Sequence, residues 1–158
     1  MESQLQILSE SLDRKLEVLK EIREYNQRQE AAFSAETVDM DGFDEAVAEK
    51  DRLIEKLTLL DAGFETMYEK LARELEGNRD KYKDRIKELQ EKISKVMEMS
   101  VLIQAQEARN KKLVEQYFSR ERRNLQQNRK HAATAYNYYK SLSGAANTET
   151  SQFMDSKK

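Results

Sequence analysis

Apolar residues recur every three or four positions along most of this chain. The first such stripe consists of six residues, Leu5, Leu8, Leu12, Leu16, Leu19 and Ile22. A second runs from Phe43 to Leu75, and a third from Tyr82 to Tyr117. This spacing places each stripe on one face of an α-helix. The sequence therefore predicts an all-α fold, a long antiparallel helical bundle or hairpin with helices at about 3–33, 40–76 and 79–130.

The breaks between these helices are marked by residues that favour helix ends. Residues 34–39 lack the stripe, and Asp39 is a good N-cap for the second helix. Gly77 suits the position just after a helix, and Asn78 suits the following N-cap. The stripe continues almost in phase across this pair, so a single unbroken helix is the alternative to a turn. We favour a tight reversal, because it lets three helices bury one another's stripes.

The third stripe has the heptad spacing of a coiled coil over about five repeats. Its positions are Tyr82, Ile86, Leu89, Ile93, Val96, Ser100, Ile103, Glu107, Asn110, Val114 and Tyr117. Polar residues occupy its middle, and in such a seam they fix the register at some loss of stability. A helix over 79–128 would be ~75 Å long against ~45 Å for the first helix, so one end should project. In the second stripe, a close helix approach would explain Gly63.

Composition and charge agree with long, exposed helices. Proline is absent, and charged residues make up 37% of the 158 residues. Residues 1–76 hold 10 Lys or Arg and 20 Asp or Glu, whereas residues 77–158 hold 18 and 10. Opposite charges favour antiparallel packing of the two halves. The alternative is that the basic half contacts nucleic acid or an acidic partner.

The chain changes character near residue 131, which predicts a bundle at 1–131 and a mobile tail at 132–158 with one latent amphipathic helix. In that helix, over 132–143, one face carries Ala132, Ala135, Tyr136, Tyr139 and Leu142. Such a face either folds back onto the chain's own bundle or docks against a partner helix. The sequence leaves both alternatives open.

Chemistry-bearing motifs are scarce. His131 is the only histidine and cysteine is absent, so a zincin motif, a dihistidine metal site and a thiolate metal site cannot be built, and we expect no metal, cofactor or enzymatic activity. We expect His131 to be solvated. Residues 109–131 carry eight basic side chains that could clamp phosphates, but the acidic first half disfavours nucleic-acid binding. No apolar run is long enough to span a membrane, which predicts a soluble, cytoplasmic protein.

Four stretches together form a pattern found in one family of helical proteins. They are the stripe Leu5–Ile22; Phe43-Asp44-Glu45 with Glu49-Lys50 and Leu53-Ile54; Gln104–Asn110 with Lys112-Leu113-Val114-Glu115; and Ala135–Tyr139 with Gln152–Lys158. This pattern resembles the flagellar type III export chaperones of the FlgN/FliT-like kind. The resemblance covers nearly the whole chain, and its most specific parts are the C-terminal stretch and the region of Asn110.

The resemblance implies a cytosolic chaperone that binds terminal helices of hook-associated or filament-cap proteins. It would keep them unassembled before secretion and deliver them to the export apparatus. The residues expected to contact such a partner are Val114, Tyr117, Phe118, Tyr136, Tyr139, Leu142 and Phe153. One alternative is a structural coiled coil without cargo that forms a homodimer along Tyr82–Tyr117. A weaker alternative is a basic-tailed RNA binder.

Overall fold

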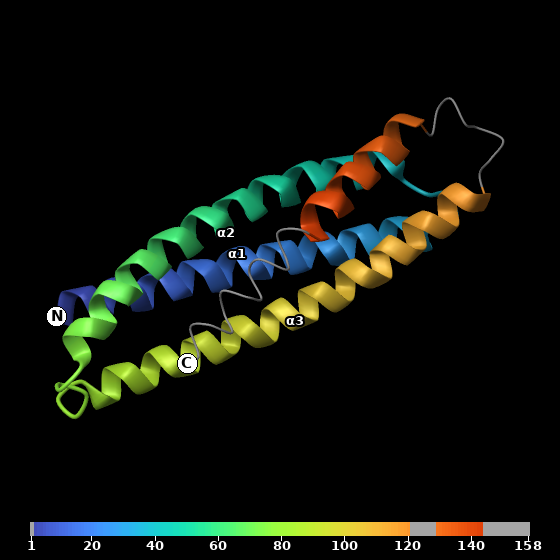
Figure 1. The fold of residues 1–158 in the computed structure, drawn as a ribbon. Coiled ribbons are helices and arrows are strands. Elements are labelled where there is room, and N and C mark those ends of the chain that lie inside the picture. Colours follow the sequence, from blue (N-terminus) through green and yellow to red (C-terminus); the bar gives the residue numbers. More distant parts are fainter. Residues whose placement is uncertain (1, 121–128, 144–158) are drawn as a thin grey trace. The chain divides into compact units, whose positions relative to one another are not determined.

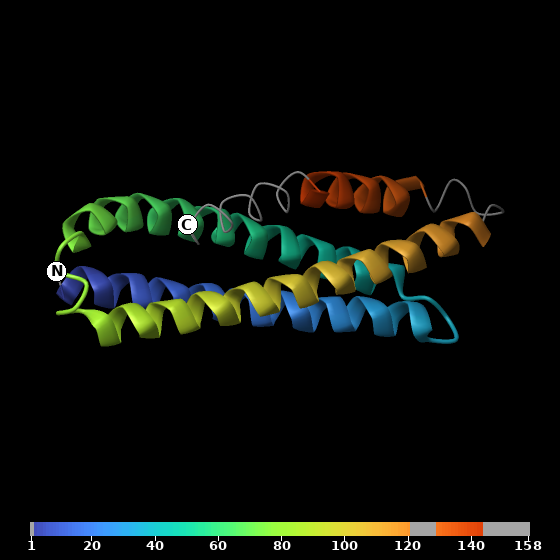
Figure 2. The ribbon, with the colours of Figure 1, turned by 60° about the horizontal axis from the view of Figure 1, so that its bottom comes forward.

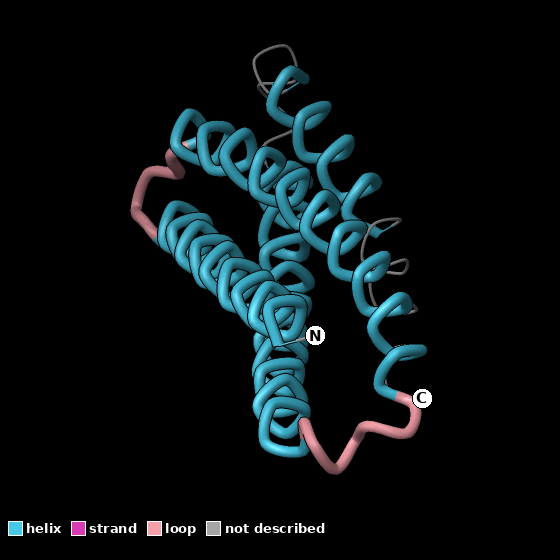
Figure 3. Tube along the Cα trace, turned by 90° about the vertical axis from the view of Figure 1, so that its left-hand side faces the viewer, coloured by secondary structure: helices cyan, strands magenta, loops and turns pink. Residues whose placement is uncertain are grey.

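The structure is a computed structural model that describes residues 2–120 and 129–143, and every regular element in these ranges is a helix (Figures 1 and 3). Three long helices are α1 (Glu2–Ser34), α2 (Met40–Leu75) and α3 (Lys83–Arg120). A further helix occupies residues 129–143 and is called the C-terminal helix below. The predicted all-α fold is confirmed. The bundle was predicted with three helices, and the described residues hold a fourth, at 129–143, which covers the latent helix expected at 132–143.

The described chain forms two compact units, and each long helix contributes to both. Unit 1 comprises Met1–Glu21 and Arg52–Val101, and unit 2 comprises Ile22–Asp51 and Leu102–Lys158. The C-terminal helix therefore belongs to unit 2. The domain boundary expected after residue 131 falls inside this helix.

The start of α2 is capped as the sequence predicted. The backbone N–H of Gly42 donates to Oδ1 of Asp39 at 2.9 Å, and the N–H of Phe43 donates to the Asp39 carbonyl at 3.1 Å. These bonds satisfy backbone donors that have no partner within the first turn of a helix. Phe43, fixed one turn into the helix, is fully buried.

The reversal between α2 and α3 is also confirmed. Gly77 has a φ of 92°, a left-handed conformation that glycine adopts without steric penalty. The N–H of Asn78 donates to the Leu75 carbonyl at 2.9 Å, and its side-chain amide lies 3.4 Å from the Glu74 carbonyl. Asn78 thus finishes α2 rather than capping α3, which begins at Lys83 and not at residue 79.

The three long helices differ less in length than the sequence analysis predicted. The described part of α3 has 38 residues, against 33 for α1 and 36 for α2. The expected long projection of α3 is therefore not found among the described residues, and residues 129 and 130 lie in a separate helix. Gly63 is also not explained as expected, because a Cβ at this position would meet no atom within 4 Å.

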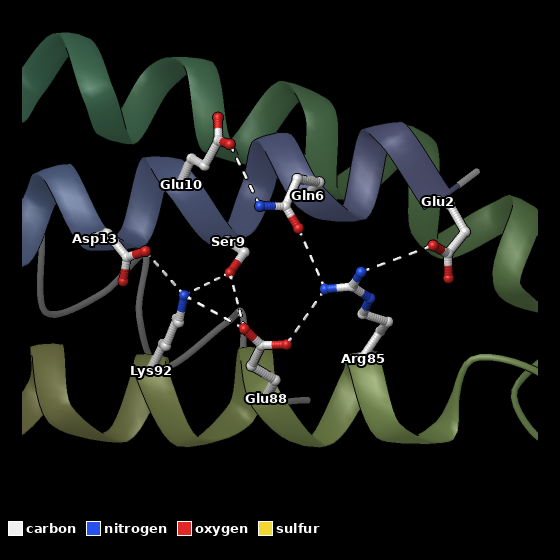
Figure 4. A network of polar contacts seen from close by, with 8 residues as sticks. All are labelled: Glu2, Gln6, Ser9, Glu10, Asp13, Arg85, Glu88 and Lys92. Carbon is white, nitrogen blue, oxygen red and sulfur yellow. Dashed lines mark hydrogen bonds and ion pairs between the residues drawn. The ribbon is translucent and has the colours of Figure 1, made fainter.

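In unit 1, parts of α1, α2 and α3 run alongside one another (Figure 2), and their leucine-rich stripes are buried. Its most buried members are Leu5, Leu8, Leu53, Leu71 and Val96. Polar side chains of α1 and α3 pair beside this core: Lys92 Nζ lies 2.9 Å from Oδ2 of Asp13, and Arg85 lies 3.2 Å from Oε1 of Gln6 (Figure 4). Both pairs are 79 positions apart, so these stretches of α1 and α3 run parallel. The expected antiparallel packing of the two halves thus does not hold for α1 and α3.

Unit 2 has an aromatic group at its core. The ring of Phe33 in α1 lies 5.4 Å from that of Phe43 in α2 and 5.7 Å from that of Tyr117 in α3, in edge-to-face arrangements. None of the eleven residues of the predicted heptad seam is exposed: six are buried and five are half-buried, and Tyr82 lies just before α3.

Candidate partner-binding site

A buried polar cluster joins the helices of unit 2, and Lys50 of α2 lies at its centre. The Lys50 side chain is fully buried. Its ammonium donates to Oδ1 of Asn26 at 2.7 Å, to Oε1 of Gln29 at 2.7 Å and to Oε1 of Glu107 at 2.8 Å. All three donors of the ammonium are therefore used, as burial of such a group requires.

The cluster extends into the C-terminal helix through Tyr138. Its hydroxyl donates to the same Oε1 of Glu107 at 2.6 Å, and the Lys50 ammonium lies 4.3 Å from the centre of its ring. Tyr138 is 2% exposed. The C-terminal helix is thus held to α3 by a hydrogen bond to a carboxylate and to α2 by a cation–π contact.

Asn110 completes the cluster on the side of α1. Its amide donates to the backbone carbonyl of Asn26 at 3.0 Å and lies 3.4 Å from Oε1 of Gln29. The amide of Asn26 in turn lies 3.3 Å from Oε1 of Gln106. The cluster therefore connects α1, α2, α3 and the C-terminal helix at one level of unit 2.

Burial shifts the protonation equilibria of this cluster. Desolvation lowers the pKa of Lys50 to about 8, against the opposing effect of the Glu107 charge. Burial raises the pKa of Tyr138 well above its ordinary value, and the neighbouring Glu107 raises it further. Tyr138 consequently remains a hydrogen-bond donor at neutral pH.

His131 anchors the beginning of the C-terminal helix. Its Nδ1 lies 2.5 Å from Oδ2 of Asp44 in α2, and its side chain is 20% exposed. The expectation that His131 is solvated was wrong, because the helix packs back onto α2 and brings the ring to this carboxylate. Of the alternatives left open for this segment, folding back onto its own unit is the arrangement observed.

The buried face of the C-terminal helix differs slightly from the predicted face. Ala135, Tyr138 and Tyr139 are its most buried residues, whereas Tyr136 is 66% exposed. The predicted face included Tyr136 and omitted Tyr138. In this orientation of the helix, the hydroxyl of Tyr138 reaches an acceptor in Glu107.

A groove of about 480 Å³ lies between α3 and the C-terminal helix. The buried side chains of Val114, Ala135 and Tyr139 contribute to its lining, together with the half-buried Phe118. Tyr136 also lines it and leaves an aromatic ring accessible to solvent. The polar cluster fixes one wall of this groove, because Tyr138 is the neighbour of Tyr139.

The structure brings together four of the seven residues expected to contact a partner, namely Val114, Phe118, Tyr136 and Tyr139, all of which line the groove. Tyr117 instead packs against Phe33 in the aromatic core. Leu142 is half-buried on the C-terminal helix and does not line the groove. Phe153 lies outside the described residues.

Three members of the polar cluster were missed by the sequence analysis, although a signal for them exists. Asn26 and Gln29 follow Ile22 at steps of four and three, so they continue the first stripe beyond Ile22, where the predicted stripe ended. Lys50 follows Val47 by three positions and precedes Leu53 by three. Polar residues in phase with an apolar stripe indicate buried polar contacts, as Glu107 and Asn110 did in α3.

No protein-family model, curated protein or solved structure matches this chain significantly. Within the described ranges, no helix combines the length and apolar character needed to cross a membrane.

Proposed function

We propose that this chain is a cytosolic flagellar export chaperone. It binds the terminal helices of hook-associated or filament-cap proteins, keeps them unassembled and releases them to the export apparatus. Its work is binding rather than catalysis. The observation that carries the proposal is the groove of unit 2, where an exposed aromatic ring borders buried apolar side chains.

The groove has the character expected of a site for part of an amphipathic helix. A helix presents apolar side chains at intervals of three and four residues, and partner grooves bind these as separate anchors. A volume of about 480 Å³ lies in the range of protein binding pockets, about 300–1,000 Å³. We infer that it takes a few anchor side chains of the cargo and leaves the rest of the cargo helix to more exposed contacts.

Such partial coverage suits a chaperone. The terminal helices of filament components carry apolar faces through which they assemble, and covering the central anchors prevents premature assembly. A small contact area also gives moderate affinity, so that the cargo can be released.

Burial argues against the homodimer alternative along Tyr82–Tyr117. A coiled-coil interface between two copies would need this seam at the surface, and none of its eleven residues is exposed. A dimer of that kind would require the helices of each copy to separate first.

Calorimetric titration tests the proposal. The full chain is titrated with terminal peptides of the hook-associated and filament-cap proteins of the same organism. We expect micromolar binding that weakens about tenfold or more in Tyr136→Ala, because removal of an interface aromatic typically costs more than about 1 kcal/mol.

Leu59→Ala is the matched control, since Leu59 is 70% exposed and lies on α2 in unit 1. It should bind as the unchanged chain does. Failure of every peptide to bind, together with concentration-dependent dimerisation, would favour the scaffold instead. Binding of RNA that falls steeply with salt would favour the nucleic-acid alternative.

A further inference from the structure

Cations border the groove between α3 and the C-terminal helix. Lys111 and Lys140 line it and are both exposed, and the Lys140 ammonium lies 5.9 Å from the centre of the Tyr136 ring. Glu115 is the one acidic residue in the lining. The described residues 102–120 and 129–143 hold seven Lys or Arg and two Asp or Glu. The rim of the groove is therefore positively charged above an apolar floor.

A buried donor in the same wall is without an acceptor. The hydroxyl of Tyr139 has no hydrogen-bond partner among the described residues. Burial raises the pKa of Tyr139, and the nearby charges of Glu107 and Glu115 raise it further, so the hydroxyl keeps its proton. Buried donors are normally paired, and an acceptor brought by a bound partner would complete this one after a small local movement.

We propose that the groove binds an amphipathic helix of a partner protein whose apolar face is flanked by aspartate or glutamate. The apolar anchors contact the floor at Val114 and Phe118, the acidic flanks pair with Lys111 and Lys140, and the Tyr139 hydroxyl supplies a donor. The inference rests on the proposed function, for which it specifies the charge of the cargo segment.

The surroundings favour a protein partner over nucleic acid. Of the aromatic rings that line the groove only Tyr136 is exposed, because Tyr139 is buried and Phe118 half-buried, so bases would find one open face for stacking. Residues 22–51, which belong to the same unit, hold nine Asp or Glu and three Lys or Arg, and this charge opposes a polyanion. A short helix with a few carboxylates meets the local cations without this long-range repulsion.

Two synthetic helical peptides test the charge preference directly. They share one apolar face with leucines at steps of three and four, and their flanking positions are all glutamate in one and all lysine in the other. Titrated into the full chain at low salt, the glutamate peptide should bind about tenfold more tightly, because two rim pairs contribute up to about 1 kcal/mol each. The preference should shrink as salt is raised.

Charge reversal at the rim supplies the matched variants. Lys111→Glu with Lys140→Glu should abolish or invert the preference, and fold should be retained because both side chains are exposed. Lys56→Glu with Lys70→Glu makes the same charge change at exposed positions of α2 in unit 1 and should leave the preference unchanged. Tyr139→Phe should weaken binding of the glutamate peptide more than binding of the lysine peptide.

Equal binding of the two peptides, or an equal effect of both charge reversals, would overturn the inference. Tighter binding of a single-stranded RNA than of the glutamate peptide would overturn it as well. If the glutamate peptide binds the rim as expected while no hook-associated or filament-cap peptide binds, the preference for acidic helices stands and the chaperone function fails.

Discussion

The ion pair of Lys92 and Asp13, which joins α1 to α3 in unit 1, remains partly in water, whereas the pair of Lys50 and Glu107, which joins α2 to α3 in unit 2, is buried. The side chains of Lys92 and Asp13 are 24% and 58% exposed. Those of Lys50 and Glu107 are 0% and 6% exposed, although their separation of 2.8 Å is nearly the same as the 2.9 Å in unit 1. Similar contact geometry therefore occurs in two very different environments.

The difference in exposure changes what each ion pair contributes to stability. Water screens an exposed ion pair, which contributes about 0–1 kcal/mol. A buried pair loses hydration on folding, so its net contribution is small, but loss of one partner leaves a charge that nothing compensates. We infer that the Lys50–Glu107 pair serves to fix where the C-terminal helix docks, and hence the shape of the groove.

The largest expected effect is the loss of one partner in unit 2. Lys50→Met leaves the Glu107 carboxylate buried without its cation and should lower the free energy of unfolding by about 3–5 kcal/mol. In the double variant Lys50→Met with Glu107→Leu, the loss should be smaller than the sum of the two single losses by about 1–3 kcal/mol. Urea denaturation at neutral pH measures all three. Strict additivity would show that the two groups are not coupled.

The second effect is a dependence of stability on pH that comes from the buried Lys50 ammonium in unit 2. The pKa of Lys50 in the folded chain, about 8, lies below its ordinary value of 10.5. Between these values the unfolded chain binds more protons, so raising the pH stabilises the folded state. Relative to the double variant, the free energy of unfolding should rise by about 2 kcal/mol between about pH 8 and pH 9.5.

The predicted rise ends at about pH 9.5 because the titration of Tyr138 lowers the free energy of unfolding at higher pH. Its pKa is raised on folding, so above about pH 10 the unfolded chain loses this proton first and the folded state is destabilised. Urea denaturation at several pH values provides the comparison. A parallel pH dependence in the unchanged chain and the double variant would contradict the assignment to Lys50.

A smaller effect, a stabilisation rather than a loss of stability, is expected from a substitution in unit 1. Gly63→Ala should raise the free energy of unfolding by about 0.5–1 kcal/mol, because glycine inside a helix is destabilising relative to alanine. The added Cβ meets no atom within 4 Å, so no clash offsets this gain. Thermal unfolding is a sufficient measurement. A destabilised variant would indicate that another surface approaches Gly63 closely.

The smallest effect concerns the exposed network of Figure 4. Lys92→Ala removes contacts to Ser9 at 2.6 Å, Asp13 at 2.9 Å and Glu88 at 3.5 Å. The loss should stay below about 1 kcal/mol and diminish at high salt. Urea denaturation at two salt concentrations checks both points. If Lys92→Ala lowered the free energy of unfolding as much as Lys50→Met, the exposed and buried ion pairs would not differ in the way described here.

More of the fold than of the site could be predicted from the sequence, and the reason is physical. Helix existence, the Asp39 cap and the turn at Gly77 follow from local periodicity and end preferences, and these were confirmed. The end of the third helix was not predicted, because the docking of residues 129–143 depends on contacts with α2 and α3.

For the site, the sequence identified the apolar side chains that line the groove but not what positions them. Asn26 and Gln29 were left out of the first stripe, since polarity alone does not reveal a buried partner that is 24 or 21 positions away in sequence. Only the three-dimensional arrangement brings Lys50 to these two amides. The sequence signal for Asn26 and Gln29 was their helical spacing from Ile22, which places them on the same buried face.

The central claim is that the partner site lies in unit 2, at the groove held by the buried cluster. The most direct test is to map chemical-shift changes by NMR in the full chain as the glutamate-flanked peptide is added. We predict that changes concentrate at Val114, Phe118, Tyr136 and Tyr139, and that the α1–α3 network around Lys92 is unaffected. Changes centred on that network instead, with the groove residues unmoved, would contradict the account.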